Sequence, residues 1–188
     1  MVYDEILDYV ESIDPTLEKP SLLNRTDSWF TCYVFRDSKP AILKVSRRGF
    51  PLVSMELSRL EDAEGSGVTP ELLDVYSLEG DNVAFLRSYV EGDLLTTSAL
   101  RNPEIFNSTL KVCDVLHERG IVGLDVKLDN FVISNDGVKI VDLGVPSRHS
   151  CPLLVDSQKD VDKIFGLAMS KYSGDVEDLV PIYKSLEL

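Results

Sequence analysis

The segment that most constrains this chain is 116–144, which places four polar side chains at fixed spacings around a loop and two apolar stretches. Asp125, Lys127 and Asn130 lie in one short loop. Asp142 comes after a separate apolar stretch and is followed two positions later by a glycine. Carboxylate, amide and ammonium groups in such an arrangement can hold Mg²⁺, a triphosphate and an attacking hydroxyl together. The segment therefore predicts phosphoryl-transfer chemistry.

The length and the apolar content limit the architecture. A chain of 188 residues has room for one compact domain or for two small lobes, and a hydrophobic fraction of 44% suffices for a buried core. No apolar run approaches the ~18 residues that a membrane-spanning helix needs. The first residues are acidic, unlike a basic and then apolar signal peptide. We therefore expect a cytoplasmic protein that does not cross a membrane.

The charge and the cysteines limit the partners. A formal charge of −13 repels phosphate backbones, so we expect no direct binding to nucleic acid, which depends on Lys and Arg. The three cysteines, Cys32, Cys113 and Cys151, are odd in number and lack metal-ligand spacing. They are interpreted as free thiols in a reducing compartment.

Apolar periodicity and turn residues predict the elements. The first half contains one helix at 2–13, a second helix that begins at Pro51, and five strands: 21–23, 29–35, 41–45, 72–76 and 83–89. After Gly92 the pattern becomes mainly helical, with a helix at 104–118, a hairpin that turns at 135–137, and helices at 160–172 and 175–187. This order predicts an α+β chain of two lobes joined near 89–93.

The segment 116–144 resembles the catalytic core of the protein-kinase superfamily, in which a D-x-K-x-x-N loop is followed by a D-x-G metal site. The resemblance extends over roughly 40–170. It implies that 1–188 is a single kinase-like domain with a bilobal fold. The implied N-lobe, at about 1–90, is a small antiparallel sheet with one helix. The implied C-lobe, at about 91–188, is reduced and mainly helical.

The resemblance assigns roles to the polar residues of the core. Asp125 orients the acceptor hydroxyl, and Lys127 meets the transferring phosphate. Asn130 and Asp142 supply the oxygen ligands of Mg²⁺. Val132 lies under the adenine of ATP.

The resemblance also assigns nucleotide-binding residues in the first half. Lys44 ends the strand Ala-Ile-Leu-Lys and binds the α- and β-phosphates, while Glu56 on the following helix pairs with that lysine. The remaining expected contacts to ATP come from Ile42, Ser88 and Val90.

Several positions depart from the kinase pattern. The chain lacks a Gly-x-Gly-x-x-Gly loop, and the corresponding turn spans 24–28, where backbone amides cannot approach phosphates as closely as glycines allow. Arg25, Thr26 or Ser28 is expected to substitute. Trp29 is interpreted as core or turn packing, with a nucleotide contact as the alternative. Arg87 stands where kinases place an apolar residue beside adenine, so the adenine pocket is expected to be narrowed.

Two further assignments concern support of the loop. His117 lies on the apolar stripe of its helix and is interpreted as a structural residue. The helix at 160–172 resembles the kinase helix that scaffolds the catalytic loop, and either Asp160 or Asp162 is its acidic residue. The short chain after 144 resembles compact members of the superfamily, such as the RIO kinases and the KEOPS-complex kinase.

The leading hypothesis is a Mg·ATP-dependent serine/threonine kinase that phosphorylates a protein or itself, alone or with a partner subunit. One alternative is an ATPase-like kinase subunit of an RNA-modification complex. Another is a pseudokinase that serves as a nucleotide-binding scaffold. The sequence identifies neither the phosphate acceptor nor the oligomeric state.

Overall fold

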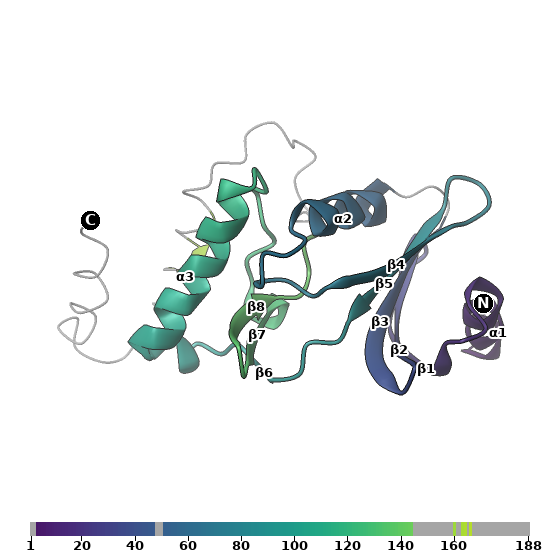
Figure 1. Cartoon of the computed structure of the whole chain (residues 1–188), viewed down its shortest axis with the longest axis horizontal. Helices are drawn as coiled ribbons and strands as arrows, with labels where there is room; N and C mark the ends of the chain where they lie inside the picture. Colours follow the sequence, from purple (N-terminus) through teal and green to yellow (C-terminus); the bar gives the residue numbers. More distant parts are fainter. Residues whose placement is uncertain (1–2, 48–50, 145–159, 161–162, 165, 167–188) are drawn as a thin grey trace. The chain divides into compact units, whose positions relative to one another are not determined.

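A computed structural model describes residues 3–47, 51–144, 160, 163, 164 and 166 (Figure 1). The chain divides into two compact units, Met1–Glu64 with Pro70–Tyr89 and Gly65–Thr69 with Val90–Leu188. A five-stranded antiparallel sheet is followed along the chain by a helix and a three-stranded sheet, which confirms the α+β class. The bilobal kinase-like domain over 1–188 stays a prediction.

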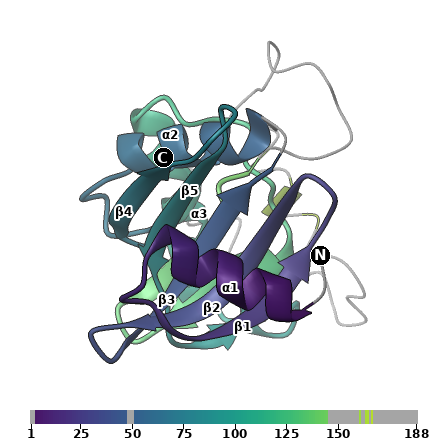
Figure 2. The same ribbon diagram turned by 90° about the vertical axis from the view of Figure 1, so that its right-hand side faces the viewer.

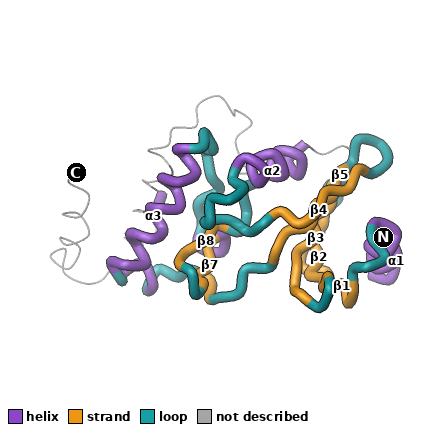
Figure 3. Tube along the Cα trace, in the orientation of Figure 1, coloured by secondary structure: helices purple, strands orange, loops and turns teal. Residues whose placement is uncertain are grey.

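The first unit is a single antiparallel sheet with strand order β1-β2-β3-β5-β4. Its elements, coloured by type in Figure 3, are α1 (Tyr3–Ile13), β1 (Glu18–Arg25), β2 (Trp29–Arg36), β3 (Lys39–Ser46), α2 (Pro51–Asp62), β4 (Leu72–Ser77) and β5 (Val83–Ser88). The five predicted strands are therefore present. β1 begins earlier than its apolar residues indicated, because the pairing of Glu18 with Phe35 extends the ladder.

Helix α1 covers one face of this sheet, as Figure 2 shows. Ile6 and Val10 stand four residues apart, so both lie on one side of the helix, and both are buried against the sheet. Phe30, Cys32 and Val34 alternate along β2 and fill the same core. The unit thus contains two helices, whereas the kinase pattern predicted a lobe with one. The additional helix is α1, which is stabilised by this apolar contact.

The opposite face of β3 carries different side chains. Because side chains alternate along a strand, Ile42, Lys44 and Ser46 point away from the face that Leu43 and Val45 share with α1. All five are buried. Helix α2 contacts β3 and β5, and it buries a stripe that consists of Val53, Glu56, Leu57 and Leu60. A carboxylate is therefore buried among the apolar residues of α2.

The second unit combines a helix with a small sheet. Its elements are β6 (Asp93–Leu94), the short 3₁₀ helices η1 (Ala99–Arg101) and η2 (Leu128–Asn130), α3 (Pro103–Glu118), β7 (Phe131–Ser134) and β8 (Gly137–Ile140). The strand order is β6-β7-β8. The Asn102 side chain caps α3 by accepting a hydrogen bond from the amide of Glu104, and Pro103 occupies the first turn. The predicted helix and hairpin are both present.

The two-residue strand β6 was not predicted. It pairs with β7 through Asp93 and Leu94, and it is too short to show a periodic pattern. Gly92, immediately before it, approaches β7 so closely that a Cβ atom would collide with the carbonyl of Ile133. Glycine is therefore required at this position for the chain to enter the small sheet.

The remaining predictions are met in part. No helix of the described residues is long and apolar enough to cross a membrane. Cys32 and Cys113 are buried free thiols, and burial raises the pKa of Cys32 to about 11 and that of Cys113 to about 12. Residues 160, 163, 164 and 166 are helical, within the predicted helix at 160–172. Cys151, Asp162 and the predicted helix at 175–187 lie outside the described residues.

Candidate functional site

The loop before β7 brings three of the predicted site residues together. The side-chain amide nitrogen of Asn130, Nδ2, donates to the main-chain oxygen of Asp125 at 2.8 Å and to its Oδ2 at 3.3 Å. Lys127 Nζ lies 3.2 Å from the same Oδ2. Asn130 is buried at the end of η2, whereas 29% of the Asp125 side chain and 48% of the Lys127 side chain are exposed. The Asp125 carboxylate and the Lys127 ammonium are thus partly exposed, and the buried side-chain amide of Asn130 holds Asp125 in place.

Asp142 is connected to this loop through the backbone. The amide of Val141, directly before Asp142, donates to the carbonyl of Asn130 at 2.8 Å. The amide of Gly144 donates to Asp142 Oδ1 at 2.8 Å, so the glycine that follows helps to fix the carboxylate. The structure therefore places the two predicted metal ligands on chain segments that are hydrogen-bonded to each other.

Electrostatics keep Lys127 charged. Burial lowers the pKa of Lys127, but the hydrogen bond and charge of Asp125 and the charges of Asp129 and Asp142 together raise it above its ordinary value. Because the ordinary pKa of lysine is already about 10.4, Lys127 is a cation at neutral pH. The three carboxylates near Lys127 oppose the binding of another anion. The Lys127 ammonium is therefore a suitable contact for a phosphate only when a bound cation offsets these negative charges.

A buried aspartate, Asp160, accepts hydrogen bonds from the backbone of the loop. Asp160 is fully buried, and its Oδ2 accepts hydrogen bonds from the amides of Gly123, at 2.9 Å, and Leu124, at 3.1 Å. His117 Nε2 lies 3.2 Å from the same oxygen. Of the two acids predicted for this role, the structure has Asp160 in contact with the loop, while Asp162 lies outside the described residues. The prediction of a structural role for His117 agrees with this contact.

Lys163 is a supporting residue that was not predicted from the sequence. Its Nζ lies 3.1 Å from the Leu124 carbonyl and 3.4 Å from Asp160 Oδ1. A lysine three residues after an acidic residue on a helix is the available sequence signal, because such positions are neighbours on the helix surface. The two residues together bind both the amide and the carbonyl of Leu124, directly before Asp125.

The donor set at the loop fits a hard cation. The amide nitrogen of Asn130 is occupied by Asp125, so the amide oxygen is the atom that can act as a ligand. Asp142 offers carboxylate oxygens, and oxygen ligands of this type suit Mg²⁺. Among the described residues, no group of three His, Cys, Asp or Glu side chains forms a metal site on its own. A metal held here therefore needs ligands from phosphate groups or water as well as from Asn130 and Asp142.

In the first unit, Lys44 on β3 and Glu56 on α2 form an ion pair between Nζ and Oε2. Only 11% of the lysine side chain and 4% of the glutamate side chain are exposed. The sheet and the helix thus hold an ammonium away from bulk water. The pairing expected from the sequence is present, and its role in nucleotide binding stays a prediction.

Trp29 adds a second contact to Lys44. The lysine Nζ lies 5.1 Å from the centroid of the tryptophan ring, within the range of a cation–π interaction. Trp29 is the first residue of β2 and follows the β1–β2 turn directly. Trp29 was predicted to serve in core or turn packing or to contact the nucleotide, and its contact with Lys44 was not predicted. No sequence signal identifies this contact, because it depends on the pairing register of β2 and β3.

The other predicted nucleotide contacts are spread over both units. In the first unit, Ile42 is buried beside Arg87 of β5, and the backbone amide of Ser88 donates to Glu71 O at 2.9 Å. In the second unit, Val90 precedes β6 as a partly exposed residue, and Val132 is buried on β7. Contacts of these four residues with ATP stay a prediction.

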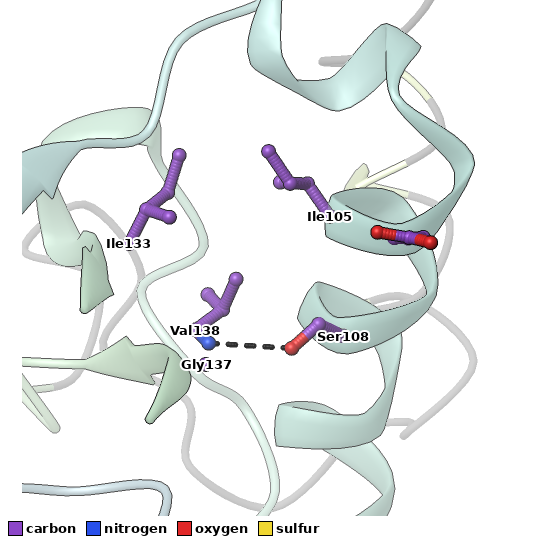
Figure 4. A pocket seen from close by; sticks show the side chains of 6 residues that line it. Ile105, Ser108, Ile133, Gly137 and Val138 are labelled. Carbon is purple, nitrogen blue, oxygen red and sulfur yellow. Dashed lines mark hydrogen bonds between the residues drawn. The ribbon is translucent and has the colours of Figure 1, made fainter. Parts of the chain in front are cut away.

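A pocket of about 220 Å³ lies in the second unit between α3 and the β7–β8 hairpin (Figure 4). Ile105, Ile133 and Val138 give it apolar walls, and Ser108 Oγ accepts a hydrogen bond from the Val138 amide at 3.2 Å. Because side chains alternate along β7, Ile133 lines this pocket and Val132 points to the other face of the strand. The pocket is thus distinct from the predicted Val132 contact.

Comparison with known proteins gives a partial similarity to kinases. The serine/threonine-protein kinase ste20 of Emericella nidulans is 28% identical over 123 residues, which are 61% of this chain and 14% of that protein. The serine/threonine-protein kinase CST20 of Candida albicans is 35% identical over 80 residues, which are 38% of this chain and 6% of that protein. No family model matches the chain.

The chain therefore spans 14% or less of the length of these curated relatives. It is distantly similar, over part of its length, to Ste20-family serine/threonine protein kinases. This similarity suggests the protein-kinase superfamily and a kinase-related function, in agreement with the motifs in 116–144.

Proposed function

We propose that the protein is a Mg·ATP-dependent phosphotransferase that transfers the γ-phosphate of ATP to a serine or threonine hydroxyl, on a protein substrate or on itself. The observation that carries the proposal is the loop cluster of Asp125, Lys127 and Asn130, linked by a backbone hydrogen bond to the segment of Asp142. The distant similarity to serine/threonine kinases supports the same reaction class.

Each group of the cluster has a proposed task. Asp125 orients the acceptor hydroxyl and accepts its proton, and its partial exposure allows an acceptor to reach it. Lys127 contacts the transferring phosphate and offsets its negative charge. Asn130 and Asp142 hold Mg²⁺, which when bound neutralises the phosphates. In the first unit, Lys44 binds the nucleotide phosphates and Glu56 fixes its position.

Replacement of Asp142 by alanine tests the metal assignment. We expect the variant to lose the additional thermal stabilisation that Mg²⁺ gives to the ATP-bound protein, because one of two protein ligands is removed. The measurement is the melting temperature with ATP, in the presence and absence of Mg²⁺. Asp136→Ala is the matched control, since Asp136 is 84% exposed on the β7–β8 turn and should leave the shift unchanged. A full wild-type shift in Asp142→Ala would refute the metal assignment.

The Lys44–Glu56 pair is tested by a double-mutant cycle. Lys44→Met is expected to weaken ATP use by about tenfold or more, since an ion-paired phosphate contact is lost, and Glu56→Gln should cause a smaller loss. In the double variant the second change should add little, because the two residues share one interaction. The measurement is the KM for ATP, with the melting temperature of the nucleotide-free protein as the folding control. Fully additive losses would show that Glu56 does not act through Lys44.

A nucleotide-binding scaffold without transfer activity is the second candidate. The β1–β2 turn favours it, because the amides of Thr26, Ser28 and Trp29 are hydrogen-bonded within the turn. Such a turn does not offer these amides to a phosphate. Transfer of labelled γ-phosphate to a generic acceptor protein separates the two candidates. Binding of Mg·ATP without any transfer would support the scaffold.

A further inference from the structure

The backbone amides of the turn between β1 and β2 form hydrogen bonds within the turn itself. The Thr26 amide donates to the carbonyl of Trp29 at 2.8 Å. The Thr26 hydroxyl oxygen accepts from the amides of Ser28, at 3.2 Å, and Trp29, at 3.1 Å. The Arg25 amide donates to Asn24 Oδ1 at 2.7 Å. Four amides of the segment are thus satisfied by the turn itself, and binding a phosphate with them requires these hydrogen bonds to break.

The same turn sets the position of the Trp29 ring. Trp29 pairs with Ser46 across the β2–β3 ladder, and Lys44 is two residues from Ser46 on β3. Residues two apart on a strand share a face, so Trp29 and Lys44 are diagonal neighbours on one side of the sheet. The 5.1 Å between Nζ and the ring centroid follows from this register. Thr26 holds the backbone of Trp29 by hydrogen bonds to both its amide and its carbonyl.

We propose that Trp29 is a positioning residue for Lys44, and that the β1–β2 turn supports the tryptophan ring instead of binding phosphate through its amides. This inference rests on the proposed nucleotide site only for its consequence in ATP binding. The contact between Trp29 and Lys44 is a property of the protein without nucleotide.

The physical reason lies in how the ammonium is held. Lys44 has a long side chain, and its ion pair with Glu56 fixes the ammonium from the α2 side. The ring of Trp29 attracts the cation through its π face without adding a negative charge. Two contacts restrict the ammonium more than one, and a restricted ammonium loses less conformational freedom when a phosphate binds. The turn therefore contributes to phosphate binding through Lys44.

Acetylation of Lys44 tests the contact directly. The protein without nucleotide is treated with acetic anhydride, and the rate of modification is followed at each lysine by peptide mass spectrometry. Lys39 is the internal reference, because it is exposed at the other end of β3. In Trp29→Leu we expect Lys44 to react about fivefold faster relative to Lys39, which corresponds to about 1 kcal/mol of lost cation–π interaction. Trp29→Phe should stay within about twofold of the wild type, because a phenyl ring retains a π face.

A second pair of variants tests the turn without changing the ring. Thr26→Val removes the hydroxyl that accepts from two amides, and the Lys44 rate should rise as in Trp29→Leu. Thr26→Ser retains the hydroxyl and should match the wild type. These variants decide the question even where Trp29→Leu does not fold. Equal relative rates at Lys44 in the wild type, Trp29→Leu and Thr26→Val would overturn the proposal.

Mg·ATP in the same assay separates this inference from the proposed function. We expect ATP to protect Lys44 in the wild type and Trp29→Phe, and to do so at about fivefold higher concentration in Trp29→Leu. An absence of protection in the wild type would contradict the nucleotide site, while the rates without nucleotide still decide the role of Trp29. Equal protection in the wild type and Trp29→Leu would overturn the consequence proposed for ATP binding.

Discussion

Replacement of Asp125 by asparagine is expected to lower the rate of phosphate transfer by at least about a hundredfold and to leave the affinity for Mg·ATP nearly unchanged. An amide keeps the size of the side chain but cannot accept the proton of the acceptor hydroxyl. A hundredfold loss corresponds to about 2.7 kcal/mol of transition-state stabilisation, which need not appear in ground-state binding.

The structure explains why binding should be spared. Asn130 donates to the main-chain oxygen of Asp125 at 2.8 Å, a shorter contact than the 3.3 Å to the carboxylate. The main-chain contact survives the substitution, so the loop and the Asn130 amide oxygen keep their positions. Asn130 itself is buried, which further restricts its movement.

The experiment measures kcat and the dissociation constant for Mg·ATP separately. Asp136→Asn is the matched control, because it removes the same charge from a side chain that is 84% exposed on the β7–β8 turn. This control should change kcat by less than about threefold, as a surface charge contributes little. Equal losses of rate and binding in Asp125→Asn would indicate a structural role, and an unchanged rate would exclude Asp125 as the acceptor-orienting residue.

The sequence predicted elements that have a clear period. Strands β2 and β4 alternate more and less buried residues, β3 and β5 are apolar runs, and α1 and α3 carry apolar stripes, so their positions agree with the prediction. β6 has two residues and no period, and its existence depends on pairing with β7. The additional helix of the first unit was predicted as a helix, but its packing on the sheet is a tertiary property that the kinase pattern did not contain.

In the candidate site, too, some features could be predicted from the sequence and others could not. Lys44, Glu56 and the loop residues occur in the order of a known motif, so these residues could be identified from the sequence. The contact of Trp29 with Lys44 depends on the register of β2 and β3, which the turn fixes and the sequence alone does not. The sequence could not decide between Asp160 and Asp162 as the acidic residue that supports the loop, because both lie on the same predicted helix.

Replacement of Asp160 by alanine is expected to destabilise the second unit by about 3 kcal/mol or more. The side chain is fully buried and accepts hydrogen bonds from the amides of Gly123 and Leu124. Its removal leaves these buried donors without their acceptor and separates Lys163 from its carboxylate. Breaking a buried charged network by deletion of one partner costs several kcal/mol.

Asp160→Asn should cause a smaller loss, because a carbonyl oxygen can still accept from the two amides while the charge is absent. The measurement is hydrogen exchange at the amides of Gly123 and Leu124, together with the melting temperature. Asp114→Ala is the control, since Asp114 is an exposed acidic residue on α3.

The expected result in Asp160→Ala is a loss of protection at Gly123 and Leu124 that exceeds the loss in α1, because the opening is local to the loop. Phosphate transfer should fall in the same variant, since Asp125 directly follows Leu124. Unchanged protection at both amides would show that Asp160 does not support the loop. Equal loss throughout both units would show that it acts on global stability instead of on the position of Asp125.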